Sequence, residues 1–156
     1  MNFKDLHNAI CTTLKKEISV IQTCEVYPAI RKELVAPALF VELVSLESGK
    51  DPGTEELALK ARFEARIVVD GTVEDSSLVV RSLAAEVARV VNKNTWEKNV
   101  SPAEFLSAEP DGFRPELDAY LVWMVDWSHQ LHLGKSIWTE NKIKPHTIII
   151  EENVRE

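Results

Sequence analysis

The segment ELDAYLVWMVDWSHQLHL, residues 116–133, decides which kind of sheet this chain forms. Every odd-numbered position from Leu117 to Leu133 is apolar except His129. Such alternation predicts a half-buried β-strand. At about 3.3 Å per residue the strand would span roughly 56 Å, about three times the length of an ordinary strand. We therefore expect either a bend or bulge near residues 127–130, or an extension of the strand into an adjacent subunit.

A second overlong strand is predicted for ELALKARFEARIVVDG, residues 56–71. Its odd positions from 57 to 69 are all apolar, whereas its even positions carry most of its charges. One face should therefore pack on the core and the other should face water or a partner. We predict that this charged face lines a lumen or contacts a partner protein through Lys60, Arg62, Glu64 and Arg66.

Two amphipathic helices are predicted, over residues 3–18 and about 76–92, because apolar residues recur there at steps of three and four. Asn2 is a plausible N-cap for the first helix. Shorter extended segments are predicted at 23–28, 38–46 and 103–110. The expected fold class is α+β: a largely antiparallel sheet with both helices packed on one face, and long strands extending toward neighbouring subunits.

Length and charge limit the function classes. The chain has 156 residues, of which 45% are hydrophobic, enough for one ordinary core. Its net charge of −7 argues against a general or sequence-specific nucleic-acid binder. The N-terminus lacks a charged region followed by an apolar run, and no stretch of 18 apolar residues occurs, so we expect a cytosolic protein without membrane contact. Cys11 and Cys24 fit that compartment as reduced, mostly buried thiols.

The sequence predicts one domain over residues 1–134 and a C-terminal extension over residues 135–156. The extension contains HTIIIEENV, residues 146–154, in which Ile148 to Ile150 form a β-prone run. Three interpretations stay open: an extra edge strand of the same sheet, an arm that adds to a neighbouring subunit, or disorder.

Motifs that carry chemistry are missing from the sequence. GxGxxG, GxxxxGK[ST], GxSxG and HExxH do not occur. His7 and Cys11 share one side of a helix, but two ligands do not make a zinc site. His129 and His132 are three residues apart, so they would lie on opposite faces of a strand. We therefore predict no catalytic, cofactor-binding or metal-binding residues, and no enzymatic activity.

Two further features have structural interpretations. If the long strands pair, Asp118 and Asp126 could contact the two arginines of the charged face, which would help to set the register. Trp123 and Trp127 share the apolar face of their strand, which favours a role in the core. A subunit interface is the alternative, because large aromatic residues are enriched there.

The order of segments resembles a known family. A short amphipathic helix is followed by EVYPAIRKELVAPALFVEL (25–43), DPGTEELALKARFEARIVVDG (51–71), a second helix, and PAEFLSAEPDGFRPELDAYLVWMVDWSHQLHLG (102–134). This pattern resembles the tail-terminator-like small tail proteins of Mu-like and related long-tailed bacteriophages and prophages. The resemblance covers residues 3–134 and does not extend to the C-terminal segment.

The resemblance implies a structural protein without enzymatic activity or cofactor. Its subunits would form a ring, commonly of six, that caps the tail tube, stops its polymerisation and joins it to the head. Its partners would be further copies of itself and other tail or head-joining proteins, first in the bacterial cytoplasm and then in the virion tail. A ring would also explain the overlong strand, whose outer half the next subunit could cover.

The subunit interface is predicted to begin where the long strand leaves the core. We expect residues 117–127 to belong to the core and the residues from His129 onward to the interface. The predicted interface residues are His129, Leu131, His132, Leu133, Trp138, Ile148, Ile149 and Ile150.

Two other function classes are compatible with the sequence. One is a small cytosolic enzyme or ligand-binding domain whose site is assembled from dispersed residues, for which Tyr27, Arg31, His129 and His132 are the candidates. The other is an adaptor that binds a partner strand along an exposed sheet edge.

Overall fold

The predicted α+β fold is confirmed by the computed structural model, which describes residues 2–26, 35–111 and 119–134. The predictions for Tyr27, Arg31, Asp118, Trp138 and the three isoleucines of the extension lie outside the described residues. The elements in chain order are α1 (Phe3–Glu17), β1 (Thr23–Val26), β2 (Ala38–Ser48), β3 (Leu57–Asp70), α2 (Ser76–Val91), β4 (Glu104–Pro110) and β5 (Tyr120–Leu133).

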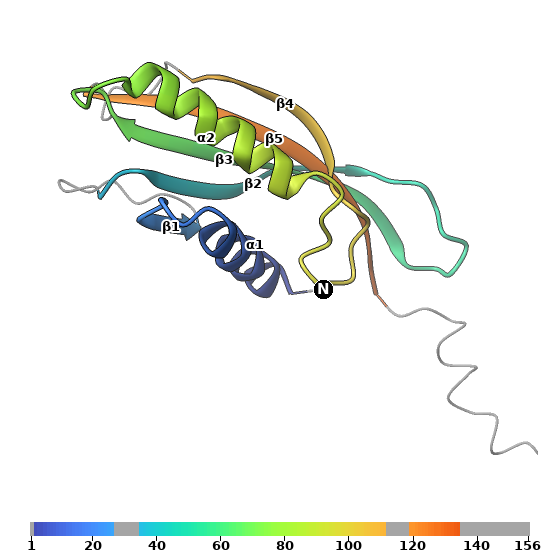
Figure 1. Ribbon diagram of the computed structural model, residues 1–156. Coiled ribbons are helices and arrows are strands. Elements are labelled where there is room, and N and C mark those ends of the chain that lie inside the picture. Colours follow the sequence, from blue (N-terminus) through green and yellow to red (C-terminus); the bar gives the residue numbers. More distant parts are fainter. Residues whose placement is uncertain (1, 27–34, 112–118, 135–156) are drawn as a thin grey trace, which may run out of the picture.

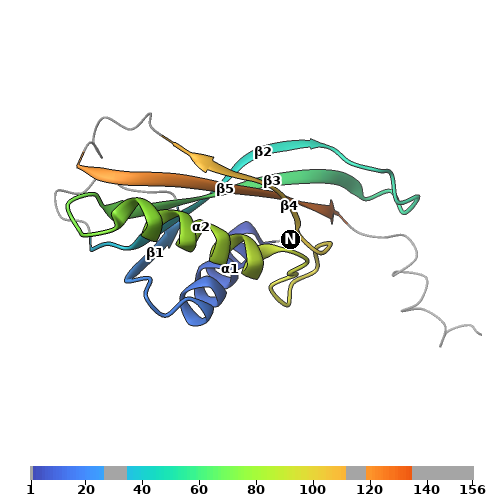
Figure 2. The same ribbon diagram turned by 45° about the horizontal axis from the view of Figure 1, so that its top comes forward.

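The five strands form one sheet in the order β1-β2-β3-β5-β4. β1 is parallel to β2, and all other neighbouring strands are antiparallel. Both helices lie on one face of this sheet, side by side with the strands that they cover (Figures 1 and 2). Among the described residues no helix covers the opposite face, which we call the open face.

The two overlong strands pair with each other along their whole length. The register runs without interruption from Leu57 opposite Leu133 to Asp70 opposite Tyr120. The expected bulge near residues 127–130 is therefore wrong. Each long strand satisfies the backbone hydrogen bonds of the other, so neither has to bend to find a partner. The register shifts lie instead between Leu43 and Ser45 in β2, and between Phe105 and Ser107 in β4.

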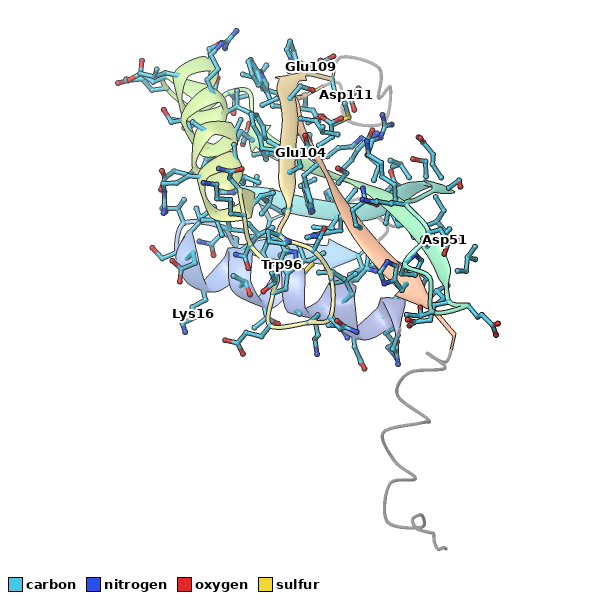
Figure 3. The ribbon with its side chains drawn as sticks, turned by 90° about the vertical axis from the view of Figure 1, so that its right-hand side faces the viewer. Lys16, Asp51, Trp96, Glu104, Glu109 and Asp111 are labelled. Atoms are coloured by element: carbon cyan, nitrogen blue, oxygen red, sulfur yellow. The ribbon has the colours of Figure 1, made fainter. Side chains whose placement is uncertain are left out.

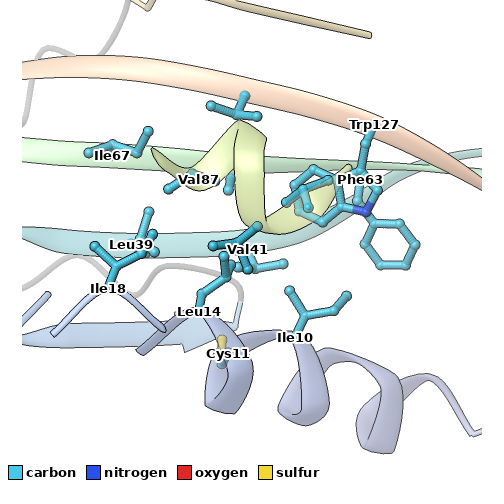
Figure 4. Close-up of a cluster of buried hydrophobic side chains, with 14 of the residues drawn as sticks. Ile10, Cys11, Leu14, Ile18, Leu39, Val41, Phe63, Ile67, Val87 and Trp127 are labelled. Carbon is cyan, nitrogen blue, oxygen red and sulfur yellow. The ribbon is translucent and has the colours of Figure 1, made fainter. Parts of the chain in front are cut away.

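The core lies between the helices and the sheet (Figure 4). Ile10 and Leu14 of α1 and Val87 of α2 point from the helices toward Phe63 of β3 and Trp127 of β5, and all five are fully buried. The predicted helical and strand periodicities supply these contacts directly, because each element presents its apolar side to the same layer. Truncation of such a side chain typically costs about 2–5 kcal/mol.

One end of the sheet extends beyond the helices (Figure 1). We call it the projecting end; it consists of the β2–β3 hairpin, residues 46–59, and Leu133 of β5 beside it. The register shift in β2 places Leu46 opposite Ala61, so that Leu46 stays on the same face as the core. The apolar face of the sheet thus continues past the point where the helices end.

Candidate functional site

Charged side chains gather on the open face around Arg66. Its guanidinium donates from Nε to Asp111 at 2.8 Å and from Nη1 to Glu42 at 2.8 Å, and Nη2 lies 2.9 Å from Glu64. Arg62 lies 3.4 Å from the second carboxylate oxygen of Glu64. One arginine therefore holds together carboxylates from β2, β3 and the residue after β4, which ties three separate segments to one another.

Burial alone would lower the pKa of Arg66, but its hydrogen bond to Asp111 and the carboxylates of Glu64 and Glu42 raise it. Asp126 lies directly opposite Glu64 and accepts a hydrogen bond of 2.6 Å from the Ser107 hydroxyl. The prediction that Asp126 could contact Arg62 or Arg66 is wrong, because both arginines pair with other carboxylates. In the observed register Arg66 lies opposite Met124, and other carboxylates are closer.

All four residues predicted to line a lumen or partner face lie on the open face. Lys60, Arg62, Glu64 and Arg66 alternate with the core residues of β3, as the period of two requires. This placement does not test the prediction that they line a lumen or contact a partner protein.

The projecting end exposes large apolar side chains on the core side of the sheet. Leu46 is 47% exposed and Leu57 is 58% exposed, whereas Leu133 is half-buried. Leu57 and Leu133 lie directly opposite each other. We treat this group of leucines as the candidate surface for association with another protein.

The predicted interface residues divide between surface and core. His132 is exposed and Leu133 is half-buried, so both are accessible to a neighbouring subunit. His129 and Leu131 are 1% and 2% exposed, so their inclusion in the interface is wrong. Their side chains point to the core face of β5, where the segment before β4 closes over His129. The boundary between core and surface therefore lies near Leu131 rather than at Trp127.

His129 is the centre of a buried polar network. Its Nε2 accepts hydrogen bonds from the indole N–H groups of Trp96 at 2.9 Å and Trp127 at 3.2 Å. Because Nε2 faces two donors, the proton of the neutral ring resides on Nδ1, which donates to the Ser101 carbonyl at 2.7 Å. Burial lowers the pKa of His129, and the hydrogen bond to Ser101 opposes this only in part. The network keeps a neutral histidine inside the protein.

The segment after α2 is folded so that Trp96 reaches His129. Trp96 itself is 4% exposed and has a left-handed backbone, with φ of 58°. Its backbone N–H donates to the Asn94 side chain at 2.8 Å, and Lys93 and Ala103 are joined by a backbone hydrogen bond of 2.8 Å. Figure 3 shows Trp96 in the loop beside α1. The sequence offered one signal for this role: a single large aromatic residue within a polar run.

One shallow hollow on the described surface lies between α1 and the loop that carries Trp96. Another lies where the hairpin loop meets the open face. The second is lined by Ser48, Lys50, Asp51, Lys60, Gln130 and His132. His132 and His129 lie on opposite faces of β5, so the structure does not bring the two candidate histidines together. Within the described ranges, no three His, Cys, Asp or Glu side chains are grouped as metal ligands would be.

The two cysteines lie close to each other as free thiols. Cys11 of α1 is buried and Cys24 of β1 is half-buried. A hydrogen bond to Cys11 together with burial raises the pKa of the Cys24 thiol. Cys24 is therefore protonated at neutral pH and is a weak nucleophile.

Comparison with known proteins gives a match of fold. No protein-family model and no curated protein matches the chain. A solved structure described as "Virion of native gene transfer agent (GTA) particle" contains a chain that superimposes with a TM-score of 0.51 at 9% sequence identity. The match covers 81% of this chain and 96% of that chain. This protein thus shares the fold of a virion chain along almost the whole length of that chain.

No helix in the described part of the chain is both long and apolar enough to cross a lipid bilayer.

Proposed function

We propose that the protein is a structural component of a phage-like particle and that it acts as a tail terminator. In this role a ring of subunits, six by the family resemblance, closes the tail tube and joins it to the head, without enzymatic activity. The observation that carries the proposal is the shared fold with a chain of a gene transfer agent virion over 96% of that chain.

The surfaces of the subunit support an assembly role. The projecting end offers exposed leucines beyond the helices, at one extremity of the molecule. A ring of more than two subunits needs a head-to-tail interface, in which one surface binds a different surface of the next copy. Such an interface closes into a ring when the rotation between neighbours divides the circle.

The test is the mass of the purified protein in solution, measured by light scattering and sedimentation, followed by negative-stain imaging. We expect a discrete oligomer that appears as a ring. A strict monomer at micromolar concentration and moderate salt would contradict ring formation.

The position in the particle needs a second experiment. In a host that produces the particles, deletion of the gene should give tails of variable, excessive length that lack heads, because nothing stops tube polymerisation. Complementation with the intact chain should restore a uniform length. Uniform, head-bearing tails in the deletion strain would contradict the terminator role.

A further inference from the structure

The two cysteines of the chain meet between α1 and β1. Cys11 belongs to the buried side of α1 together with Ile10 and Leu14, and Figure 4 shows the three residues in this layer. Cys24 is the second residue of β1 and packs against the same core. Figures 1 and 2 both show β1 beside α1. The Cys24 thiol forms a hydrogen bond with Cys11, so the two sulfur atoms are in direct contact.

The pair lies at the border of the core. In the described part of the sheet β1 has one neighbour, β2, and all four of its residues are half-buried. Cys24 is therefore partly open to solvent, whereas Cys11 is 9% exposed. A small oxidant thus has a short path from solvent to both sulfur atoms.

The two thiols differ in reactivity. The hydrogen bond from Cys24 lowers the pKa of Cys11, although burial and the carboxylate of Glu25 oppose this effect. The same hydrogen bond, together with burial, raises the pKa of Cys24. Because the thiolate is the nucleophilic form of cysteine, Cys11 is the thiol that reacts first. Cys24 keeps its proton and is placed to react second.

A metal ion does not account for the pair. Within the described ranges, no further His, Cys, Asp or Glu side chain joins the two thiols in a group of metal ligands. A disulfide needs two sulfur atoms about 2.05 Å apart. Two thiols that already share a hydrogen bond reach this distance by a small approach of their side chains. The geometry therefore fits a disulfide better than a metal site.

We propose that Cys11 and Cys24 are a redox pair, which a peroxide converts reversibly into a disulfide between α1 and β1. The bond attaches the edge strand β1 covalently to the helix beside it. This proposal goes beyond the proposed function and does not depend on it, because the assembly of a particle requires no such reaction.

The reaction is a two-electron oxidation. The Cys11 thiolate attacks one oxygen atom of hydrogen peroxide, the O–O bond breaks, and hydroxide leaves, which produces a sulfenic acid on Cys11. The Cys24 sulfur then attacks the Cys11 sulfur, the S–O bond breaks, and the departing hydroxide takes the proton of Cys24. Two thiols and one hydrogen peroxide molecule thus give one disulfide and two water molecules. A dithiol reductant reverses the bond.

Treatment of the reduced, full-length protein with hydrogen peroxide is the test. Free thiols, counted after denaturation, should fall from two per chain to none, and the intact mass should fall by two hydrogen atoms. Peptide mapping should locate the bond between Cys11 and Cys24. The melting temperature should rise by about 5–10 °C, because the bond restricts the unfolded chain. Dithiothreitol should return it to the initial value.

Single variants test the order of the two steps. Cys24→Ser should stop the reaction at the sulfenic acid of Cys11, which dimedone traps as an adduct. Cys11→Ser should react about tenfold more slowly, because burial keeps the Cys24 thiol protonated. Cys11→Ser combined with Cys24→Ser should show no change in melting temperature with peroxide, which separates the disulfide from oxidation of methionine.

The matched control moves one thiol by a single position. Cys11→Ala with Thr12→Cys keeps two cysteines, but position 12 is exposed and lies about 100° further around α1. This variant should form no bond within the chain.

Three results would overturn the redox pair. In the first, both thiols of the wild type stay free or gain only oxygen atoms. In the second, the disulfides form only between chains. In the third, the control variant forms an internal bond as readily as the wild type, which would show that contact in the folded protein does not select the partner.

Discussion

At the scale of single residues, His129 decides the local structure around the carboxyl-terminal half of β5. Three hydrogen bonds converge on its ring, two from indole N–H groups and one to a backbone carbonyl. The same residue in an isolated strand would be an interruption of the apolar face. Inside the protein it is the acceptor that allows two tryptophans to be buried with their polar groups satisfied.

We expect His129→Phe to destabilise the fold by about 2–4 kcal/mol, because both indole donors and the Ser101 carbonyl lose their partner while buried. The measurement is urea denaturation followed by tryptophan fluorescence. His132→Phe is the matched control on the exposed face of the same strand and should unfold at nearly the wild-type urea concentration. Equal losses in both variants would show that the network contributes nothing specific.

The pH dependence follows from the same network. The pKa of His129 is lowered in the folded protein, so the unfolded chain binds the proton first as the pH falls. Its contribution to stability is therefore complete above the ordinary histidine pKa of about 6.5, and decreases as the pH falls below that value. Wild-type protein should lose more unfolding free energy between pH 7.5 and pH 5.5 than His129→Gln does. Identical losses would contradict the assignment.

At the scale of elements, the cluster around Arg66 connects β2 and β3 to the end of β4. Three carboxylates from these segments share one guanidinium, whose side chain is 14% exposed. The charges lie on the open face, where no helix of the described chain packs. The arginine therefore joins these three segments through hydrogen bonds and ion pairs on the open face.

Arg66→Gln should destabilise the protein by about 1–3 kcal/mol, because Glu42, Glu64 and Asp111 would repel one another without their common cation. Thermal unfolding at low and high salt is the measurement, and added salt should recover part of the loss by screening the repulsion. Arg89→Gln removes an exposed ion pair with Glu86 on α2 and should leave the unfolding temperature unchanged.

At the scale of the whole molecule, the subunit has a core at its centre and an apolar surface at one extremity. Leu46 and Leu57 lie on the face of the sheet that is buried elsewhere. They belong to the end of the β2–β3 hairpin, which extends beyond the helices (Figure 2). This arrangement separates the residues that stabilise the subunit from those available for assembly.

Leu57→Asp should therefore weaken association between subunits at least tenfold, because it places a charge in an apolar contact. The average mass of the protein in solution should fall accordingly. Its unfolding free energy should stay close to that of the wild type. Sedimentation velocity over a concentration series measures the first quantity and urea denaturation the second. Leu78→Asp on α2 is a control of similar exposure that should keep the wild-type mass. An unchanged mass for Leu57→Asp would remove the projecting end from the interface.

The periodic elements were predictable because their cause is local. Both helices, the two long strands and the shorter strands occur where the spacing of apolar residues places them, and Asn2 caps α1 by accepting from the Asp5 N–H at 3.2 Å. Lys60, Arg62, Glu64 and Arg66 of β3 lie together on one face for the same reason. A period of two or of 3.6 residues is a property of neighbouring positions, so the sequence alone reveals it.

The tertiary structure alone decided which elements meet. That β3 pairs with β5, that Arg66 contacts Asp111, and that Trp96 closes over His129 all depend on contacts between residues 30 or more positions apart. No local pattern encodes these partners, because many registers would satisfy the same alternation. The sequence by itself therefore determined the length and sidedness of the strands, and the packing of the whole chain determined that His129 belongs to the core and the exposed leucines to the surface.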